Sequence, residues 1–214
     1  MEKVLYRNLI EEDCEVCKKL IGEAFGFNEF IKDEKFLNLM LESYLNECIL
    51  ESSFSKVAIK DDKVIGLILG GADKDKNRLK VNDDFKLDYE KEEIESLMEN
   101  VSEENKNVIK ELLKIKIVYD EIIDDKNKKG EFQGSIQLFI VSKESRGLGV
   151  GKKLLNYLFD YMKNMDVKSL YLYTDTRCNY GFYDSQNFKR LREKELYFDS
   201  IKAKLDVFLY GYYF

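Results

Sequence analysis

Residues 136–153 read IQLFIVSKESRGLGVGKK, and this stretch decides the fold of the 214-residue chain. The apolar run over 135–141 predicts a strand, and the polar residues 142–151 predict a turn. Apolar residues at helical spacing then predict a helix over 149–165. Glycines in the turn let the backbone approach a ligand closely, and the helix start adds unpaired N–H groups and a positive dipole end. A strand, a glycine loop and a helix in this order therefore predict a binding site for an anion such as a phosphate.

Three other interpretations of the loop compete. A Walker A loop requires GxxxxGK[ST], but Arg146 stands at its first glycine and Lys153 at its serine or threonine. A Rossmann GxGxxG motif requires glycine or alanine at Lys152, and it belongs to an early βαβ unit. A glycine-rich turn without a ligand is the third. Three glycines so close together at a helix start favour a ligand over that plain turn.

The pattern [RQ]-x-x-G-x-[GA] fits the loop, with Arg146 first, Gly149 fourth and Gly151 sixth. A predicted strand over 168–174 and the run FYDSQNF over 182–188 follow in order. With this ordered set the sequence resembles the GNAT superfamily of N-acetyltransferases. The resemblance implies an α/β (α+β) fold, in which helices flank a mixed, mostly antiparallel central sheet.

The resemblance covers about residues 1–71 and 133–214, because the other predicted elements also follow the family's order. They are an N-terminal strand at 4–7, helices at 11–25 and 33–50, hairpin strands at 56–60 and 64–69, a short helix at 179–185, and late strands at 193–198 and 204–210. Asn187 replaces the usual glycine in FYDSQNF. Asparagine tolerates the left-handed conformation that glycine would adopt, so the pattern still holds.

Residues 73–132 differ in charge composition from the rest of the chain. Through position 131 they hold 18 acidic and 13 basic residues, which is −5 of the chain's net −6. Apolar stripes at 94–101 and 108–122 predict two helices, with Ser102 as the N-cap of the second. We therefore expect a single GNAT domain over 1–214, with a charged helical insertion at 73–132 between the third and fourth strands.

Composition excludes several classes of protein. The absence of histidine removes Ser-His-Asp and Cys-His catalysis and all histidine-containing zinc sites. A net charge of −6 argues against nucleic acid or an anionic membrane as partner, and no apolar run is long enough for a membrane span. The one CxxC, at Cys14 and Cys17, has no second pair. We expect a cytoplasmic protein with four reduced cysteines and no metal.

The resemblance also assigns roles to the loop and its neighbours. Acetyl-CoA would be the co-substrate, with its pyrophosphate on the backbone amides of the loop and its pantetheine arm along the preceding strand. The implied cofactor-binding residues are Phe139, Ile140, Val141, Arg146, Gly147, Leu148, Gly149, Val150, Gly151, Lys152 and Asn179. Tyr183 would donate a proton to the leaving thiolate, which suits a phenol with a pKa near 10.

The implied reaction is direct attack by a primary amine, from a small molecule or a peptide, in a ternary complex. An acetyl-cysteine route through Cys178 is the covalent alternative, but it lacks a histidine to activate the thiol. The candidates for the general base are Asp175, Gln137, Glu131 and a water relay. A non-catalytic acyl-CoA-binding or sensing domain and a nucleotide-binding protein are the alternative functions.

Two further regions carry predictions of their own. The insertion is either a solvated pair of helices or a cover for the acceptor groove, whose Glu92, Glu93 and Glu95 would guide a cationic amine. The tail FLYGYYF at 208–214 has five aromatic residues. We expect it to be buried, and it could pair in a homodimer.

Overall fold

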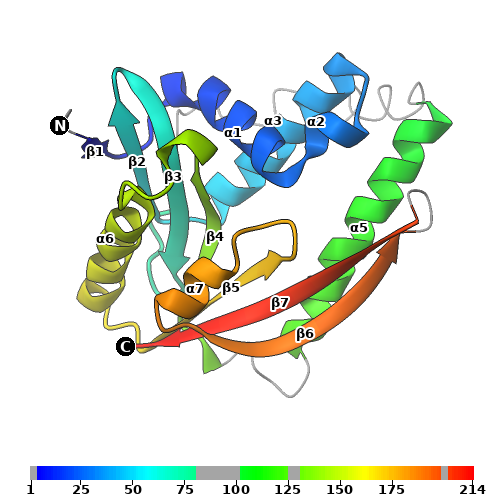
Figure 1. Cartoon of the computed structure of the whole chain (residues 1–214). Helices are drawn as coiled ribbons and strands as arrows, with labels where there is room; N and C mark the ends of the chain where they lie inside the picture. Colours follow the sequence, from blue (N-terminus) through cyan, green and yellow to red (C-terminus); the bar gives the residue numbers. More distant parts are fainter. Residues whose placement is uncertain (1–3, 81–101, 125–130, 199–201) are drawn as a thin grey trace.

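The computed structural model describes residues 4–80, 102–124, 131–198 and 202–214 (Figure 1). Its centre is a seven-stranded sheet with the order β1-β2-β3-β4-β5-β7-β6. The strands are β1 (Leu5–Arg7), β2 (Phe54–Lys60), β3 (Lys63–Ala72), β4 (Gly134–Val141), β5 (Ser169–Asp175), β6 (Lys189–Phe198) and β7 (Ala203–Tyr213). Neighbouring strands are antiparallel except β4 and β5, which are parallel. The mixed, mostly antiparallel sheet predicted from the sequence is confirmed.

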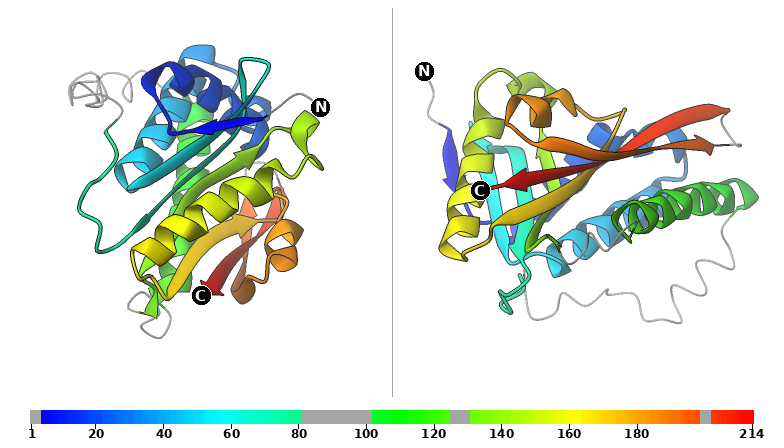
Figure 2. Two further views of the ribbon diagram at one scale, coloured as in Figure 1. Left: turned by 90° about the vertical axis from the view of Figure 1, so that its left-hand side faces the viewer. Right: turned by 90° about the horizontal axis from the view of Figure 1, so that it is seen from below.

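Helices cover both faces of this sheet (Figure 2). They are α1 (Cys14–Phe25), α2 (Phe27–Phe30), α3 (Glu34–Leu50), α5 (Glu103–Asp124), α6 (Val150–Asn164) and α7 (Gly181–Ser185). Successive strand side chains point to opposite faces, so Leu172 of β5 packs under α6 while Tyr173 packs on the side of α5. On the face opposite α6, α1 and α3 cover β2 to β4, and α5 covers β6 and β7.

The β2–β3 hairpin turns at Asp61 and Asp62, which both have positive φ, 51° and 59°. Such φ values are typical of tight hairpin turns and suit short polar residues. β3 continues past the predicted end to Ala72, because its two glycines pair with β4. A Cβ on Gly70 would lie 2.5 Å from the carbonyl oxygen of Ser135, so this pairing requires glycine.

The acidic residues before α1 form a turn of their own. Glu11–Asp13 is a 3-10 turn, and α1 begins at Cys14 instead of at position 11 as predicted. The reason is the buried Asp13 carboxylate, which accepts hydrogen bonds from Arg7 of β1 at 2.6 Å and from the backbone N–H of Ile10 at 3.1 Å. These contacts hold the start of α1 against β1.

The helical insertion is confirmed at its second helix. α5 lies between β3 and β4 in the chain, and the Ser102 hydroxyl caps it by accepting from the Asn105 N–H at 3.2 Å. Val118 and Ile122 of α5 pack against Val207 of β7, so this helix belongs to the folded domain and is not merely solvated. The predicted helix at 94–101 and the residues Glu92, Glu93 and Glu95 lie outside the described residues.

The aromatic tail is a central strand. β7 lies between β5 and β6, where Phe208 and Tyr210 are buried beneath the α6 layer. Burial of the tail is therefore achieved within one chain, and only its last two residues, Tyr213 and Phe214, are exposed. The homodimer stays a prediction, but burial of the aromatic tail is no longer a reason to expect it.

All four cysteines are free, and Cys17 lies in the core between α1 and α3. In the part of the chain that the structure describes, no three Cys, Asp or Glu side chains gather as they would around a metal ion. Nor does any helix there combine the length and apolar character that crossing a membrane requires.

Candidate functional site

The sheet opens between its two parallel strands. β4 and β5 pair only at Ser135 and Tyr171, so they diverge toward their C-terminal ends. A β-bulge contributes to the divergence, because Leu69 pairs with Leu138 and Gly70 with Ile136, which leaves Gln137 without a partner on β3. The wedge between the strands leads into a cavity of about 890 Å³.

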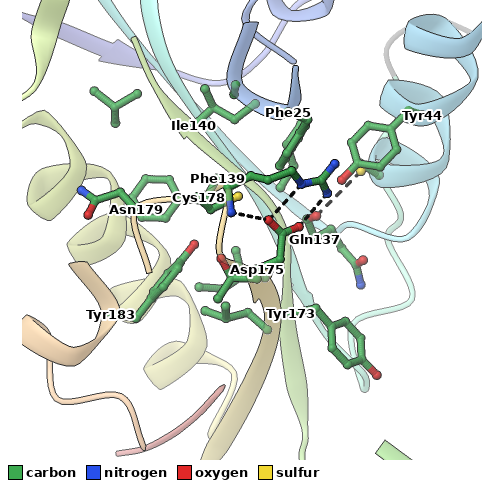
Figure 3. Close-up of a pocket in the computed structure, with 18 of the residues that line it drawn as sticks. Phe25, Tyr44, Gln137, Phe139, Ile140, Tyr173, Asp175, Cys178, Asn179 and Tyr183 are labelled. Atoms are coloured by element: carbon green, nitrogen blue, oxygen red, sulfur yellow. Dashed lines mark hydrogen bonds and ion pairs between the residues drawn. The ribbon is translucent and has the colours of Figure 1, made fainter. Parts of the chain in front are cut away.

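This cavity gathers nearly all of the site residues predicted from the sequence. Its lining includes Phe139, Ile140, Val141, Arg146, Gly147, Gly149, Val150, Gly151, Lys152, Asp175, Asn179 and Tyr183. Leu148 is the exception, because its side chain is 58% exposed and does not line the cavity. Figure 3 shows Asn179 and Tyr183 on one side of the cavity, Tyr44 and Gln137 on the other, and Asp175 between them.

The glycine loop is shaped for a close ligand. Gly147 and Gly149 have positive φ, 81° and 75°, and a Cβ on either would meet no protein atom within 4 Å. Gly149 is the N-cap of α6, where no side chain caps the helix and no acidic residue lies in the first turn. The first backbone N–H groups of α6 are therefore available to an anion, and the cationic side chains of Arg146 and Lys152 line the same end of the cavity.

Tyr183 stands on α7 with its ring in the core. It is 9% exposed and packs edge-on against Phe188 at 5.5 Å and Phe139 at 6.4 Å between ring centroids. Burial raises its pKa, so the phenol is protonated at neutral pH. Among the described residues none forms a hydrogen bond with its hydroxyl, which leaves this donor to the cavity.

The Asp175 carboxylate, at the end of β5, is buried, and both of its oxygens accept hydrogen bonds. Its Oδ1 accepts from the backbone N–H and the Nε of Arg177, at 2.9 and 3.0 Å, and its Oδ2 accepts from Nη2 at 2.7 Å. Both oxygens are occupied by one guanidinium in a bidentate pair. This geometry favours a positioning role, in which Asp175 fixes Arg177 in the cavity wall.

The other predicted base candidates are placed differently. Gln137 lines the cavity, and its amide donates to the Ser135 hydroxyl at 2.9 Å. Glu131 lies before β4, outside the cavity lining, and accepts from the Tyr213 hydroxyl at 2.8 Å. Glu131 is therefore not positioned for proton transfer in this cavity.

The acetyl-cysteine alternative finds little support in the surroundings of Cys178. Its thiol lines the cavity, but burial raises its pKa to about 11, so it is protonated at neutral pH. The thiolate is the nucleophilic form of cysteine, and no described neighbour lowers the pKa enough to produce it.

The opposite wall of the cavity comes from residues that the sequence did not identify as functional. Tyr44 of α3 and Tyr119 of α5 line it, and burial raises the pKa of both phenols. Tyr119 stacks on Tyr173 of β5 with 4.3 Å between ring centroids. Both tyrosines lie on the apolar faces of their predicted helices, and periodicity alone does not distinguish a core residue from a cavity wall.

Comparison with known proteins places this site in a family. A family model for the acetyltransferase (GNAT) family matches residues 18–188. The chain belongs to this family. As a GNAT protein it is an acyltransferase, and its cavity is where the fold brings the loop, Tyr183 and Asn179 together.

Solved structures share the GNAT fold at low identity. A ribosomal-protein-alanine N-acetyltransferase from Brucella melitensis is 15% identical with a TM-score of 0.52, covering 98% of this chain and 99% of that one. NAA60 from Arabidopsis thaliana, solved with a bisubstrate analogue, is 17% identical with a TM-score of 0.53, covering 99% and 98%. A NatC complex bound to Gag peptide and CoA has 17% identity, a TM-score of 0.51 and coverage of 100% and 99%. No curated protein matches the chain.

Proposed function

We propose that the protein is an N-acetyltransferase that transfers an acetyl group from acetyl-CoA to a primary amine by direct attack in a ternary complex. One observation carries the proposal. The uncapped N-terminus of α6 and the side chain of Tyr183, whose hydroxyl has no hydrogen-bond partner among the described residues, line the same cavity, at the point where β4 and β5 diverge.

The glycine loop fits the pyrophosphate of acetyl-CoA. Space beside Gly147 and Gly149, which a Cβ would fill, lets two phosphate groups approach the backbone N–H groups. Arg146 and Lys152 add positive charge at this end. We assign the backbone of Phe139–Val141, along the diverging edge of β4, to the pantetheine arm as an added strand, together with the Asn179 side chain.

Acetyl-CoA, when bound, supplies a thioester. In the proposed transfer a bond forms between the amine nitrogen and the acyl carbon while the bond between that carbon and sulfur breaks. Tyr183 gives its proton to the departing thiolate, because its buried phenol remains protonated at neutral pH. The ammonium proton leaves by a water relay through the cavity, and Asp175 positions Arg177 beside that path.

The acceptor is a primary amine of a small molecule or a peptide. NAA60 and NatC, whose folds resemble this one, were solved with a bisubstrate analogue and a peptide respectively, which makes peptides one class to test. The protein is expected to act in the cytoplasm, because all four cysteines are free thiols.

Two measurements test the proposed function. Isothermal titration with acetyl-CoA should show binding that ATP and NAD do not displace, and thiol release over a panel of amines should then identify turnover. Binding with no release for any amine would make the protein an acyl-CoA-binding or sensing domain. Affinity for ATP or NAD that survives excess CoA would instead make it a nucleotide-binding protein.

A further inference from the structure

The cavity extends from the glycine loop into a groove between α3 and α5. Glu47 of α3 and Lys116 of α5 form an ion pair at 2.5 Å that links the two helices across this groove. Tyr171, at the closed end of the wedge between β4 and β5, forms part of its floor. Ser135 pairs with Tyr171, and Val141 lies six residues beyond Ser135 along β4, so the two ends of the cavity are roughly 20 Å apart.

The walls of the groove are aromatic. The rings are those of Phe25, Phe27, Tyr44, Tyr119, Tyr171 and Tyr173. Their apolar edges suit an aliphatic chain, and their faces attract a cation within about 6 Å. A flexible amine with a hydrocarbon spacer matches this surface better than a strongly polar acceptor does.

The charges in the groove are predominantly negative. Glu47, Glu51, Asp120 and Asp175 line it, against only two cationic side chains among the described residues, Lys116 and Arg177. Each of these cations is already paired, Lys116 with Glu47 and Arg177 with Asp175. An acceptor that carries a carboxylate would therefore meet unneutralised acids and no cation that is free to bind it.

Lys116 places one primary ammonium among these carboxylates. Its pKa is raised, chiefly by the hydrogen bond to Glu47 and further by the charges of Asp120 and Glu51. One ammonium thus shares three carboxylates, which leaves net negative charge for a second one.

We infer that the acceptor is an extended aliphatic amine with a second ammonium group, held by Glu51 and Asp120 at the α3–α5 end of the cavity while the first ammonium lies near Asp175. This inference rests on the proposed acetyl transfer. Asp175 lies four residues beyond Tyr171 along β5, so the two nitrogen atoms would be on the order of 13 Å apart. The substrate class is therefore a long diamine or polyamine.

Three amines of equal chain length test the inference: octamethylenediamine, octylamine and ω-aminooctanoate. Calorimetry with CoA-saturated protein measures their binding without requiring turnover, and thiol release measures kcat/KM. We expect the diamine to bind about tenfold more tightly than octylamine, because its second ammonium gains a charge-assisted contact that octylamine lacks, and ω-aminooctanoate to bind most weakly.

A double variant identifies the residues responsible. Glu51→Gln with Asp120→Asn should bring the affinity for the diamine to within about twofold of that for octylamine. Glu23→Gln with Asp160→Asn removes two exposed charges outside the cavity and should retain the preference.

Equal binding of the three amines, a preference for ω-aminooctanoate, or a preference that survives the double variant would overturn the inference. The two proposals fail separately. If the diamine binds but no thiol is released, only the proposed acetyl transfer is contradicted. If thiol is released at the same rate with all three amines, only the inference of a diamine acceptor is contradicted.

Discussion

The two ends of the cavity are built by different means. At the glycine loop the proposed ligand-binding groups are backbone N–H groups at the start of α6, which need glycines at fixed positions and a following helix. At the α3–α5 groove the proposed binding groups are side chains from four distant segments of the chain. Backbone recognition leaves a motif in the sequence, whereas side-chain recognition depends on packing and leaves none. The co-substrate is thus predictable from the sequence, and the acceptor requires the structure.

The largest expected effect is at the glycine loop. Gly149→Asp should weaken CoA binding by about 10³-fold or more, because it adds a Cβ and a negative charge where the pyrophosphate approaches a residue with φ of 75°. Calorimetry with CoA measures the loss. Asn164→Asp places the same charge at the far end of α6 and should keep the affinity of the native protein.

Strain and charge can be separated at the same position. Gly149→Ala introduces the Cβ without the charge, so it should lower stability through its positive φ but weaken CoA less than aspartate does. Native CoA affinity in Gly149→Asp would contradict the acetyl-CoA assignment as a whole.

The second effect concerns Tyr183 of α7, which lines the cavity. Tyr183→Phe keeps the ring and removes the proton donor, so kcat should fall on the order of 10²-fold while CoA affinity is retained. Tyr180→Phe removes a neighbouring hydroxyl outside the cavity lining and serves as the matched control. Native turnover in Tyr183→Phe would make Tyr183 a packing residue.

The pH profile gives an independent check on Tyr183. Burial raises the pKa of Tyr183 above the ordinary 10.0, and the proposed mechanism requires the protonated form. The donor is therefore present at every pH below 10.0 and is lost only as pH rises through the higher value. A fall in kcat between pH 7 and about 9 that disappears in Tyr183→Phe would show that the phenol ionises early and would contradict its burial.

Particular residues show which features of the fold can be predicted from the sequence. Asn187 has φ of 65°, as its substitution for glycine predicted, and Ser102 caps α5. β6 begins at Lys189 and not at position 193, because it is an edge strand whose first residues are polar and exposed and show no apolar alternation. Strand ends of this kind are set by pairing with β7, which a local pattern does not reveal.

The candidate site also contains residues that a local motif predicts and contacts that depend on packing. The roles of the loop residues follow from a motif, whereas the ion pair of Asp175 with Arg177 depends on how the turn after β5 folds back. Glu47 and Lys116, which form an ion pair between α3 and α5, lie 69 residues apart in the chain. No spacing rule covers such a contact, so the acceptor wall appears only once α3 and α5 are packed against one sheet.

The third effect tests whether α5 serves the acceptor or only the fold. Tyr119→Leu preserves apolar volume but removes the ring that stacks on Tyr173, so the KM for the acceptor should rise about tenfold with the KM for acetyl-CoA unchanged. Tyr197→Leu, at an exposed position of β6, is the control. If the KM values for the acceptor and for acetyl-CoA rise together, or if Tyr119→Leu lowers the melting temperature enough to explain the loss of activity, α5 only supports the sheet.

The smallest effect is the dependence on salt, and it compares the two ends directly. The carboxylates Glu51 and Asp120 should attract a cationic acceptor over a distance set by the Debye length, which falls from about 10 Å at 0.1 M salt to about 3 Å at 1 M. With acetyl-CoA saturating, so that the basic loop no longer contributes, kcat/KM for octamethylenediamine should drop about threefold across this range. The Glu51→Gln/Asp120→Asn variant should begin lower and remain flat, because it lacks the charges that salt screens. Parallel curves for the two proteins would mean that the groove holds its acceptor by aromatic contact alone, and that its negative charge has no part in guiding the amine to the thioester.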